Sequence, residues 1–250
     1  MARLFTHILA AAGLAAALTG CNYSMHPGGN GIPLAELERA GTAPDEVTLA
    51  GPDRVIVTRG DAFAVTVEGD SAAVDLIRFD RSDGSLGIYR EDRSDNVEGK
   101  ATVRVTLPVL HGIAIAGSGI IEADELTGNA EVGIAGSGQA RAARIAAQTL
   151  QVNFGGSGRF TGAGTAERLE LNIAGSGKGD MAGLRVGSAD VTIAGSGQAD
   201  FASDGKVQAD IIGSGTVRVA GNAQCSVEKV GSGRLICGGG TGMVQGTASE

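Results

Sequence analysis

The stretch that decides the fold is residues 169–197, which read LELNIAGSGKGDMAGLRVGSADVTIAGSG. It contains the tripeptide Gly-Ser-Gly twice, and apolar residues occupy every second position before each copy. The whole chain carries seven copies, with successive serines 18 to 20 residues apart. A unit repeated at one such period is the signature of a repeat architecture. The seven serines are Ser118, Ser137, Ser157, Ser176, Ser196, Ser214 and Ser232.

The segments on both sides of each tripeptide alternate between apolar and polar residues, as in 169–173 before a copy and 216–219 after one. Alternation with period two is typical of half-buried strands, and strands on both sides of a glycine corner make one coil of a β-helix. We therefore expect an all-β fold, a right-handed β-helix or β-solenoid of seven coils with 18–20 residues each and an N-terminal β cap. An antiparallel meander of hairpins is the alternative. It ranks second, because a meander would give mirror-related pairs of like residues, whereas here like residues recur in columns at one period.

The Gly-Ser-Gly tripeptide suits a tight corner. Glycine adopts positive φ and permits close backbone approach, and a small residue between two glycines avoids crowding where corners stack. We expect the stacked serine hydroxyls to form a hydrogen-bonded ladder. A phosphate-binding loop is excluded, because only Lys178 follows a copy and the required Lys-Ser/Thr pattern is missing. A nucleophile elbow is excluded because its spacing is Gly-x-Ser-x-Gly.

A different β region, residues 47–110, precedes the repeats. We expect it to form the N-terminal cap, or the first coils, of the same solenoid, because an uncapped end exposes backbone edges. The charged segment 90–100 is predicted to be an exposed loop. The predicted strands are residues 55–58, 63–67, 86–89 and 102–107.

The first residues indicate export and lipid attachment. Arg3 precedes the apolar run 8–18, which is shorter than the roughly 20 residues that a bilayer span needs. Residues 18–21, Leu-Thr-Gly-Cys, match the lipobox of bacterial lipoproteins, in which the Cys thiol carries the lipid. An ordinary signal peptide followed by a coincidental Cys is the alternative. We expect Cys21 to be lipidated, and the non-acidic Asn22 favours the outer membrane.

These features divide the chain into five parts. The Gly- and Pro-containing segment after the lipobox is predicted to be a tether that holds the domain off the membrane. The membrane is therefore an expected partner, bound through the N-terminal lipid. The parts are a lipoprotein signal peptide (1–20), a flexible tether (21–45), an N-terminal β region (46–112), the Gly-Ser-Gly repeats (113–240) and a C-terminal tail (241–250).

Composition and charge exclude several classes of function. Aromatic residues make up only 3% of the chain and Trp is absent, so the core is expected to be built from Val, Ile, Leu and Ala. The net charge of −8 opposes binding to nucleic acid. Calcium-binding β-helices need an Asp at a fixed place in each coil, and we expect neither a metal site nor a cofactor. The third position after each tripeptide mixes acid, base and aliphatic residues: Glu122, Arg141, Thr161, Asp180, Asp200, Arg218 and Ile236.

The two cysteines that remain after Cys21, Cys225 and Cys237, are predicted to form a disulfide at the C-terminal end of the solenoid. Paired cysteines in an oxidising compartment usually bridge. Both fall in inward columns, on the two strands that meet at the last Gly-Ser-Gly corner. Two buried free thiols are the alternative, because the two columns are offset by about one inward step.

Four segments follow one another along the chain: residues 55–61, 63–70, 84–88 and 103–110, the last of which runs directly into 115–119. In this order they resemble the putative auto-transporter adhesin family with the head GIN domain. The resemblance covers about residues 46–240 and implies a β-helical domain in the bacterial cell envelope.

Three hypotheses of function remain. The first is a lipid-anchored, adhesin-like binding module without catalysis, whose ligand is an envelope protein or a glycan. The second is a structural or stress-sensing periplasmic lipoprotein. The third and weakest is a polysaccharide-processing enzyme, because such sites add paired carboxylates and aromatic platforms, and the chain has no Trp. His111 lies beside a strand junction and is interpreted as structural, so we expect no catalytic residue.

Overall fold

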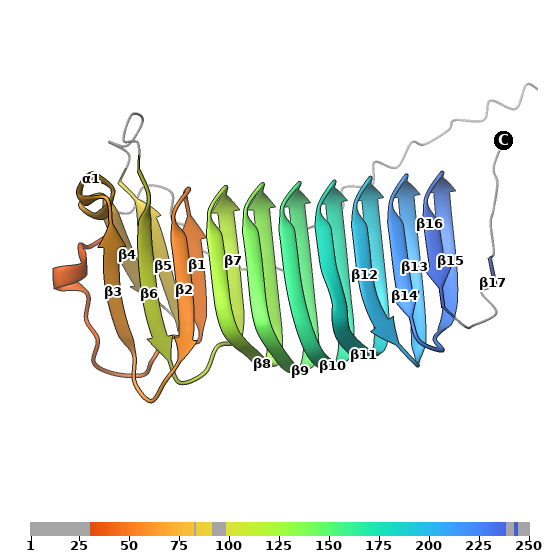
Figure 1. The fold of residues 1–250 in the computed structure, drawn as a ribbon, viewed down its shortest axis with the longest axis horizontal. Helices are drawn as coiled ribbons and strands as arrows, with labels where there is room; N and C mark the ends of the chain where they lie inside the picture. Colours follow the sequence, from red (N-terminus) through yellow and green to blue (C-terminus); the bar gives the residue numbers. More distant parts are fainter. Residues whose placement is uncertain (1–30, 83, 92–98, 239–242, 245–250) are drawn as a thin grey trace, which may run out of the picture.

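The computed structural model describes residues 31–82, 84–91 and 99–238, together with 243 and 244. In these ranges the chain is a nearly all-β solenoid, with strands stacked side by side along its long axis (Figure 1). A 3₁₀ helix, η1 (Leu34–Glu36), and a short α-helix, α1 (Ser71–Val74), lie at the N-terminal end. No described helix is long and apolar enough to cross a bilayer.

The strands fall into an N-terminal set and a repeat set. The N-terminal set is β1 (Glu46–Ala50), β2 (Arg54–Arg59), β3 (Ala64–Gly69), β4 (Ile77–Ser82), β5 (Ser85–Arg90) and β6 (Ala101–Leu107). The repeat set is β7 (Gly112–Gly117), β8 (Ile120–Gly136), β9 (Gln139–Gly156), β10 (Arg159–Gly175), β11 (Lys178–Gly195), β12 (Gln198–Ser203), β13 (Lys206–Gly213), β14 (Thr216–Ala220), β15 (Gln224–Gly231), β16 (Arg234–Cys237) and β17 (Met243–Val244).

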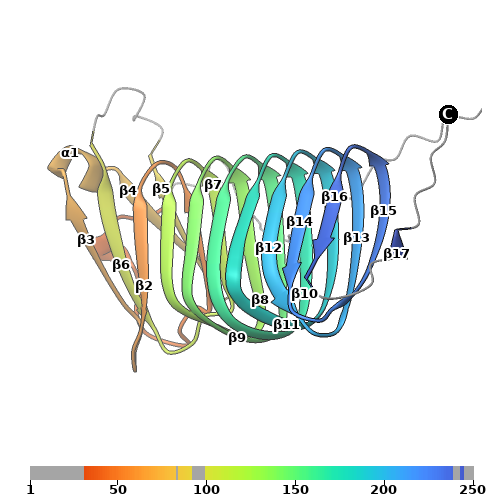
Figure 2. The ribbon, with the colours of Figure 1, turned by 45° about the vertical axis from the view of Figure 1, so that its right-hand side comes forward.

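Each coil contributes to two faces of the solenoid. Face 1 holds the stretch that follows each Gly-Ser-Gly corner, and face 2 holds the stretch that precedes the next corner. The long strands β8 to β11 run along face 1, bend and return along face 2 (Figure 2). Later coils divide the same path between two strands, so β12 and β14 lie on face 1, and β13 and β15 lie on face 2.

Neighbouring coils pair in parallel and in register. Leu171 of β10 lies beside Val152 of β9 and Val191 of β11, so equivalent positions form columns along the axis. The third position after each tripeptide forms one such column from β8 to β16. These registers confirm the predicted β-solenoid. The parallel pairing rules out the antiparallel meander.

The corner glycines meet both of the demands that the sequence suggested. The first glycine of every tripeptide has a positive φ, as at Gly175 (φ 123°). The second approaches the preceding coil closely: a Cβ on Gly197 would lie 2.5 Å from Cγ2 of Ile173. The ladder along the corners runs through the backbone, where the N–H of Ser176 donates to the carbonyl of Gly156 at 2.8 Å.

The expected ladder of serine hydroxyls is wrong. The serine side chains of the corners are exposed, and no hydrogen bond joins one hydroxyl to the next in the described chain. The backbone joins the corners instead, because the N–H of each corner serine from Ser137 to Ser214 donates to a glycine carbonyl of the coil before it. The serine side chains are exposed to solvent, and the backbone makes the contacts between corners.

Inward columns of aliphatic residues fill the solenoid. The column two residues before each tripeptide holds Ile134, Ile173, Ile193 and Ile211, all at most 2% exposed. Burial follows directly from the alternation of the sequence, since successive residues of a strand point to opposite faces. The largest fully buried side chains include Phe79, Phe160 and Phe201.

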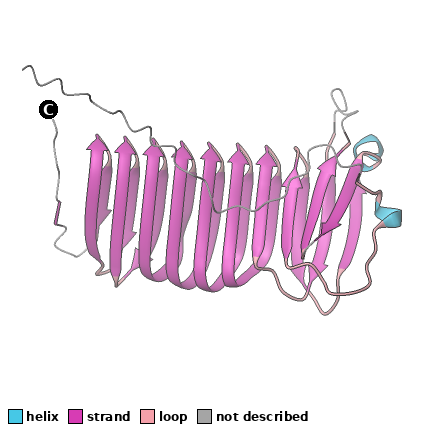
Figure 3. Cartoon of the chain, turned by 180° about the vertical axis from the view of Figure 1, so that it is seen from behind, coloured by secondary structure: helices cyan, strands magenta, loops and turns pink. Residues whose placement is uncertain are grey.

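The N-terminal region combines two coils with a cap. β1 pairs with β5 and β7, and β2 pairs with β6 and β8. The first coil of the chain, formed by β1 and β2, therefore lies between the coil of β5 and β6 and the coil of β7 and β8. After β6, the chain crosses this first coil before it begins β7. β3 pairs antiparallel with β6, and β4 pairs antiparallel with β5, and these two strands finish the end beside the two short helices (Figure 3).

A buried ion pair joins the inserted first coil to the coil outside it. The Asp53 carboxylate, between β1 and β2, accepts two hydrogen bonds of 2.6 Å from the Arg90 guanidinium at the end of β5. It also accepts one of 2.8 Å from the N–H of Ala101 at the start of β6. The Asp53 and Arg90 side chains are 1% and 8% exposed. The hydrogen bonds with Asp53 raise the pKa of Arg90 above its usual value, although burial opposes this.

Residues 31–45, which the sequence placed in the flexible tether, pack on the N-terminal end of the solenoid. Leu37 is buried, and Ile32 forms an antiparallel bridge with Phe79 of β4. The Arg81 guanidinium donates hydrogen bonds to three backbone carbonyls of this segment, those of Glu38, Ala40 and Thr42. The predicted domain boundary at residue 45 is therefore wrong, because these contacts make residues 31–45 part of the folded domain.

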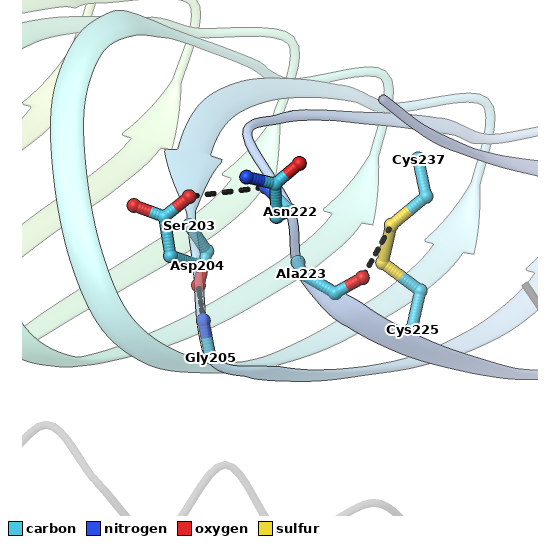
Figure 4. The surroundings of a disulfide bond; sticks show 7 residues. All are labelled: Ser203, Asp204, Gly205, Asn222, Ala223, Cys225 and Cys237. Atoms are coloured by element: carbon cyan, nitrogen blue, oxygen red, sulfur yellow. Dashed lines mark hydrogen bonds between the residues drawn. A yellow bond between two sulfur atoms is a disulfide. The ribbon is translucent and has the colours of Figure 1, made fainter. Parts of the chain in front are cut away.

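A disulfide joins Cys225 of β15 to Cys237 of β16 at the C-terminal end (Figure 4). The two Cα atoms are 6.6 Å apart. Cys225 continues the buried column of Val207, and Cys237 continues that of Val219, as the repeat spacing predicts. Beside it, the carbonyl of Ala223 lies 3.9 Å from the Cys237 sulfur.

We expect this disulfide to form in an oxidising compartment. Mass spectrometry without reduction should find a peptide pair joined through Cys225 and Cys237. Changing both residues to Ser should lower the free energy of unfolding by about 3 kcal/mol, because the bridge closes a loop in the unfolded chain. Alkylation of both thiols without reductant, in material from the native compartment, would contradict the prediction.

Candidate binding surface

Face 1 carries charged side chains along its whole length. The first and third positions after each tripeptide point outward, because the second and fourth positions are mostly buried. Cationic side chains outnumber anionic ones on this face, although the chain as a whole has a net charge of −8. The cationic residues are Arg54, Arg59, Arg104, Arg141, Arg144, Arg159, Lys178, Arg185, Arg218 and Arg234, and the anionic ones are Glu68, Glu122, Asp124, Glu125, Asp180, Asp200 and Asp204.

Many of these charges pair between neighbouring coils. Arg54 contacts Glu122 at 2.6 Å, Arg218 contacts Asp200 at 3.3 Å, and Arg159 contacts Asp180. Exposed ion pairs typically contribute less than about 1 kcal/mol each, so they arrange the surface more than they stabilise the fold. Within the described chain no carboxylate pairs with Arg141 or Arg234, which leaves cationic groups available on this face.

Face 2 has the opposite charge balance. Its Asn153 and Asn172 side chains hydrogen-bond at 3.0 Å across neighbouring coils. The column just before each tripeptide is small, with Ala or Gly in the first coils, and changes to Ile212 and Val230 in the last two. The anionic residues of face 2 are Glu46, Asp80, Glu131, Glu170, Asp190, Asp210 and Glu228, and the cationic ones are Arg78, Arg168 and Lys206.

A shallow pocket lies where the β6–β7 connection passes the end of β2. Arg59 and Glu125, an ion pair of 2.7 Å, line it together with Leu107 and the exposed Val109. Its cavity volume is about 40 Å³, whereas pockets for small molecules usually measure about 300–1,000 Å³. The pocket has room for only a few water molecules. Face 1 is therefore the larger of the two candidate binding surfaces.

His111 lies in an acidic cluster at the junction of cap and repeats. Its Nδ1 is 3.2 Å from a carboxylate oxygen of Asp45, and its backbone N–H donates to the Asp45 carbonyl at 2.7 Å. Burial, together with the neighbouring Asp45 and Glu131, raises the pKa of Glu46, and His111 partly opposes the rise. No group of three or more His, Cys, Asp or Glu in the described ranges could hold a metal ion. The contacts of His111 join β1, β7 and β8, in keeping with a structural role.

The structure places the sequence-predicted residues in two groups. The seven serines form one exposed row along the corners, and Cys225 and Cys237 meet at the C-terminal end. Cys21 lies outside the described residues. The charged ladder of face 1 was missed as a candidate surface, although the sign change between Glu122 and Arg141 in adjacent coils is its signal.

Comparison with known proteins supports the same fold. An adhesin described as putative, from Bacteroides fragilis NCTC 9343, is 22% identical with a TM-score of 0.68, over 82% of this chain and 93% of that one. A putative lipid binding protein from Parabacteroides distasonis ATCC 8503 is 23% identical with a TM-score of 0.61, over 78% and 93%. A putative adhesin from Parabacteroides merdae ATCC 43184 is 16% identical with a TM-score of 0.59, over 80% and 93%.

Among curated proteins, none matches the chain. The model of one protein family matches residues 43–223, which include the N-terminal β region and most of the repeats. The chain therefore belongs to the family described as putative auto-transporter adhesin, head GIN domain.

Proposed function

We propose that this protein is a lipid-anchored, non-catalytic binding module of the bacterial cell envelope, held in the outer membrane by Cys21, and that face 1 binds its ligand. The observation that carries the proposal is the charged ladder of face 1, by which we mean its outward charged side chains and the ion pairs between neighbouring coils, such as Arg54–Glu122 and Arg218–Asp200. It runs along successive coils, and its inter-coil ion pairs hold the side chains in place. Membership of a family named for adhesins supports a binding role. The ligand class that suits this face is an acidic glycan of the envelope or of a neighbouring cell.

The charge pattern favours an extended anionic partner. Coils stack about 4.8 Å apart, so side chains of one column recur at that spacing along the face. Arg141 and Arg234 have no carboxylate partner in the described chain, and Arg218 is paired only at 3.3 Å. A polymer with repeated carboxylates can therefore contact several coils at once, and such multivalent contacts raise the overall affinity.

Binding to a carboxylated polysaccharide tests the assignment of face 1. We expect the protein to bind immobilised polygalacturonate and not neutral dextran, more weakly at high salt because ions screen exposed charges. Replacing Arg141 and Arg218 by Glu together should weaken binding by about tenfold or more, an effect of at least about 1.4 kcal/mol. The matched control carries Arg168→Glu and Lys206→Glu on face 2, which change the net charge equally. Equal loss in both variants, or no binding by the parent, would contradict the proposal.

Membrane attachment is tested separately. Cys21→Ser should move the protein from the membrane fraction to the soluble fraction, because a lipidated N-terminal Cys carries the acyl chains that anchor it. Membrane-bound material in the Cys21→Ser variant after cell fractionation would show that the anchor lies elsewhere. The conservative change Asn22→Ser should leave attachment unchanged and serves as the control.

A further inference from the structure

The two ends of the solenoid are finished differently. At the N-terminal end the outermost coil, formed by β5 and β6, is covered. The antiparallel strands β3 and β4, the helices η1 and α1 and the rest of residues 31–45 lie over it. At the C-terminal end, within the described ranges, no strand pairs with the outer edge of β16. β17 pairs with β15 only at Ser226 and Val227. An open strand edge is a template for pairing with another chain.

The open end is also more apolar than the rest of the surface. Ile212, Val230 and Ile236 are 53%, 66% and 48% exposed, whereas earlier coils carry Ala, Gly or polar and charged residues in the same columns. Leu235 is only half-buried, although its column partner Val217 is fully buried. Apolar side chains and unpaired backbone groups therefore meet at this end.

One residue of the last coil breaks the inward pattern. The column of Ile115, Ile134, Phe154, Ile173, Ile193 and Ile211 continues at Lys229 of β15. The six apolar members are at most 3% exposed, whereas Lys229 is half-buried. No described residue forms an ion pair or hydrogen bond with its ammonium group. A lysine stem can cover apolar surface while its charged head stays in water, and here water is reached at the open end.

We propose that Lys229 keeps the open C-terminal end of the solenoid from pairing with the same end of a second copy. Inward-pointing charges on terminal strands are a known means of blocking such pairing. Because the N-terminal end is covered, end-to-end contact would join two C-terminal ends about a two-fold axis. A two-fold interface contains each residue twice, so two Lys229 ammonium groups would be desolvated in it, neither with a carboxylate partner among the described residues.

The test is the oligomeric state of the purified full-length chain with Lys229→Ile. Ile is the commonest residue of this column, so the variant should fold and should melt at a higher temperature than the parent. We expect the parent to be monomeric and the mass of the variant to double as its concentration rises, measured by sedimentation. Hydrogen exchange should show new protection in β16. Lys229→Ala removes the charge without adding volume, so it should dimerise more weakly than Lys229→Ile but more strongly than the parent. It keeps the test open if Lys229→Ile fails to fold.

The matched control is Lys206→Ile, which makes the same chemical change at an exposed position of β13. It should remain monomeric. The proposal is overturned if both Lys229 variants stay monomeric, if the control dimerises equally, or if the parent already pairs through β16. Open-ended polymers instead of dimers would overturn it as well, because the proposed contact joins two C-terminal ends and therefore stops at a pair.

Discussion

Gly175→Val is expected to lower the free energy of unfolding by about 4 kcal/mol. Gly175 has φ 123°, a conformation that residues with a Cβ rarely adopt and that costs them about 1–3 kcal/mol. An added Cβ would also lie 2.5 Å from the carbonyl oxygen of Gly156 in the preceding coil. That oxygen accepts the N–H of Ser176, so it cannot move away without breaking the ladder.

Gly155→Ala is the matched control, because Gly155 has no positive φ and open space around its Cα. Its column holds Ala135 and Ala174 in the adjacent coils, so Ala should be neutral or slightly stabilising. Chemical denaturation followed by circular dichroism measures both variants. A Gly175→Val protein as stable as the parent would show that the corner tolerates a side chain and that the tripeptide is not needed for its geometry.

Asp53→Ala should lower the free energy of unfolding of the N-terminal end by about 3–5 kcal/mol. Removing one partner of a buried ion pair leaves the other charge buried, and this is costlier than losing an exposed pair. The Arg90 guanidinium and the N–H of Ala101 would both lose their carboxylate. Solenoids unfold partly by coils, so the loss should appear first as faster hydrogen exchange in β1, β5 and β6.

Arg54→Ala is the control for this prediction. Arg54 follows Asp53 in the sequence, but its pair with Glu122 is exposed, with side chains 44% and 36% accessible. Its loss should therefore change stability by less than about 1 kcal/mol. Equal effects of Asp53→Ala and Arg54→Ala would mean that the buried pair does not hold the inserted coil in place.

Much of the fold could be predicted from the repeat because a solenoid coil depends mainly on its neighbours in sequence. The spacing of Ser157 and Ser176 sets which residues stack, and alternation sets which side chains point inward. Both are local properties, and parallel in-register stacking converts them directly into columns. This is why the neighbours of Cys225 and Cys237 in the repeat could be identified without coordinates.

The candidate surface was less predictable. The third position after each tripeptide forms one column, as the period predicts, but its mixture of acid, base and aliphatic residues by itself indicates neither a metal site nor a binding surface. Their meaning depends on pairs such as Arg218 and Asp200, which lie 18 residues apart and meet only because coils stack. The buried pair of Asp53 and Arg90 left no periodic signal at all.

The sequence by itself determined the solenoid, its corners and its inward columns, because these follow from period and side-chain size alone. Tertiary structure decided the order of coils at the N-terminal end, where β1 and β2 lie between strands that follow them in the chain. Each of these strands has the same alternation, so any of them could stack on β7 or β8. The choice depends on contacts between distant residues, such as the Asp53–Arg90 pair, whose energy no local pattern encodes.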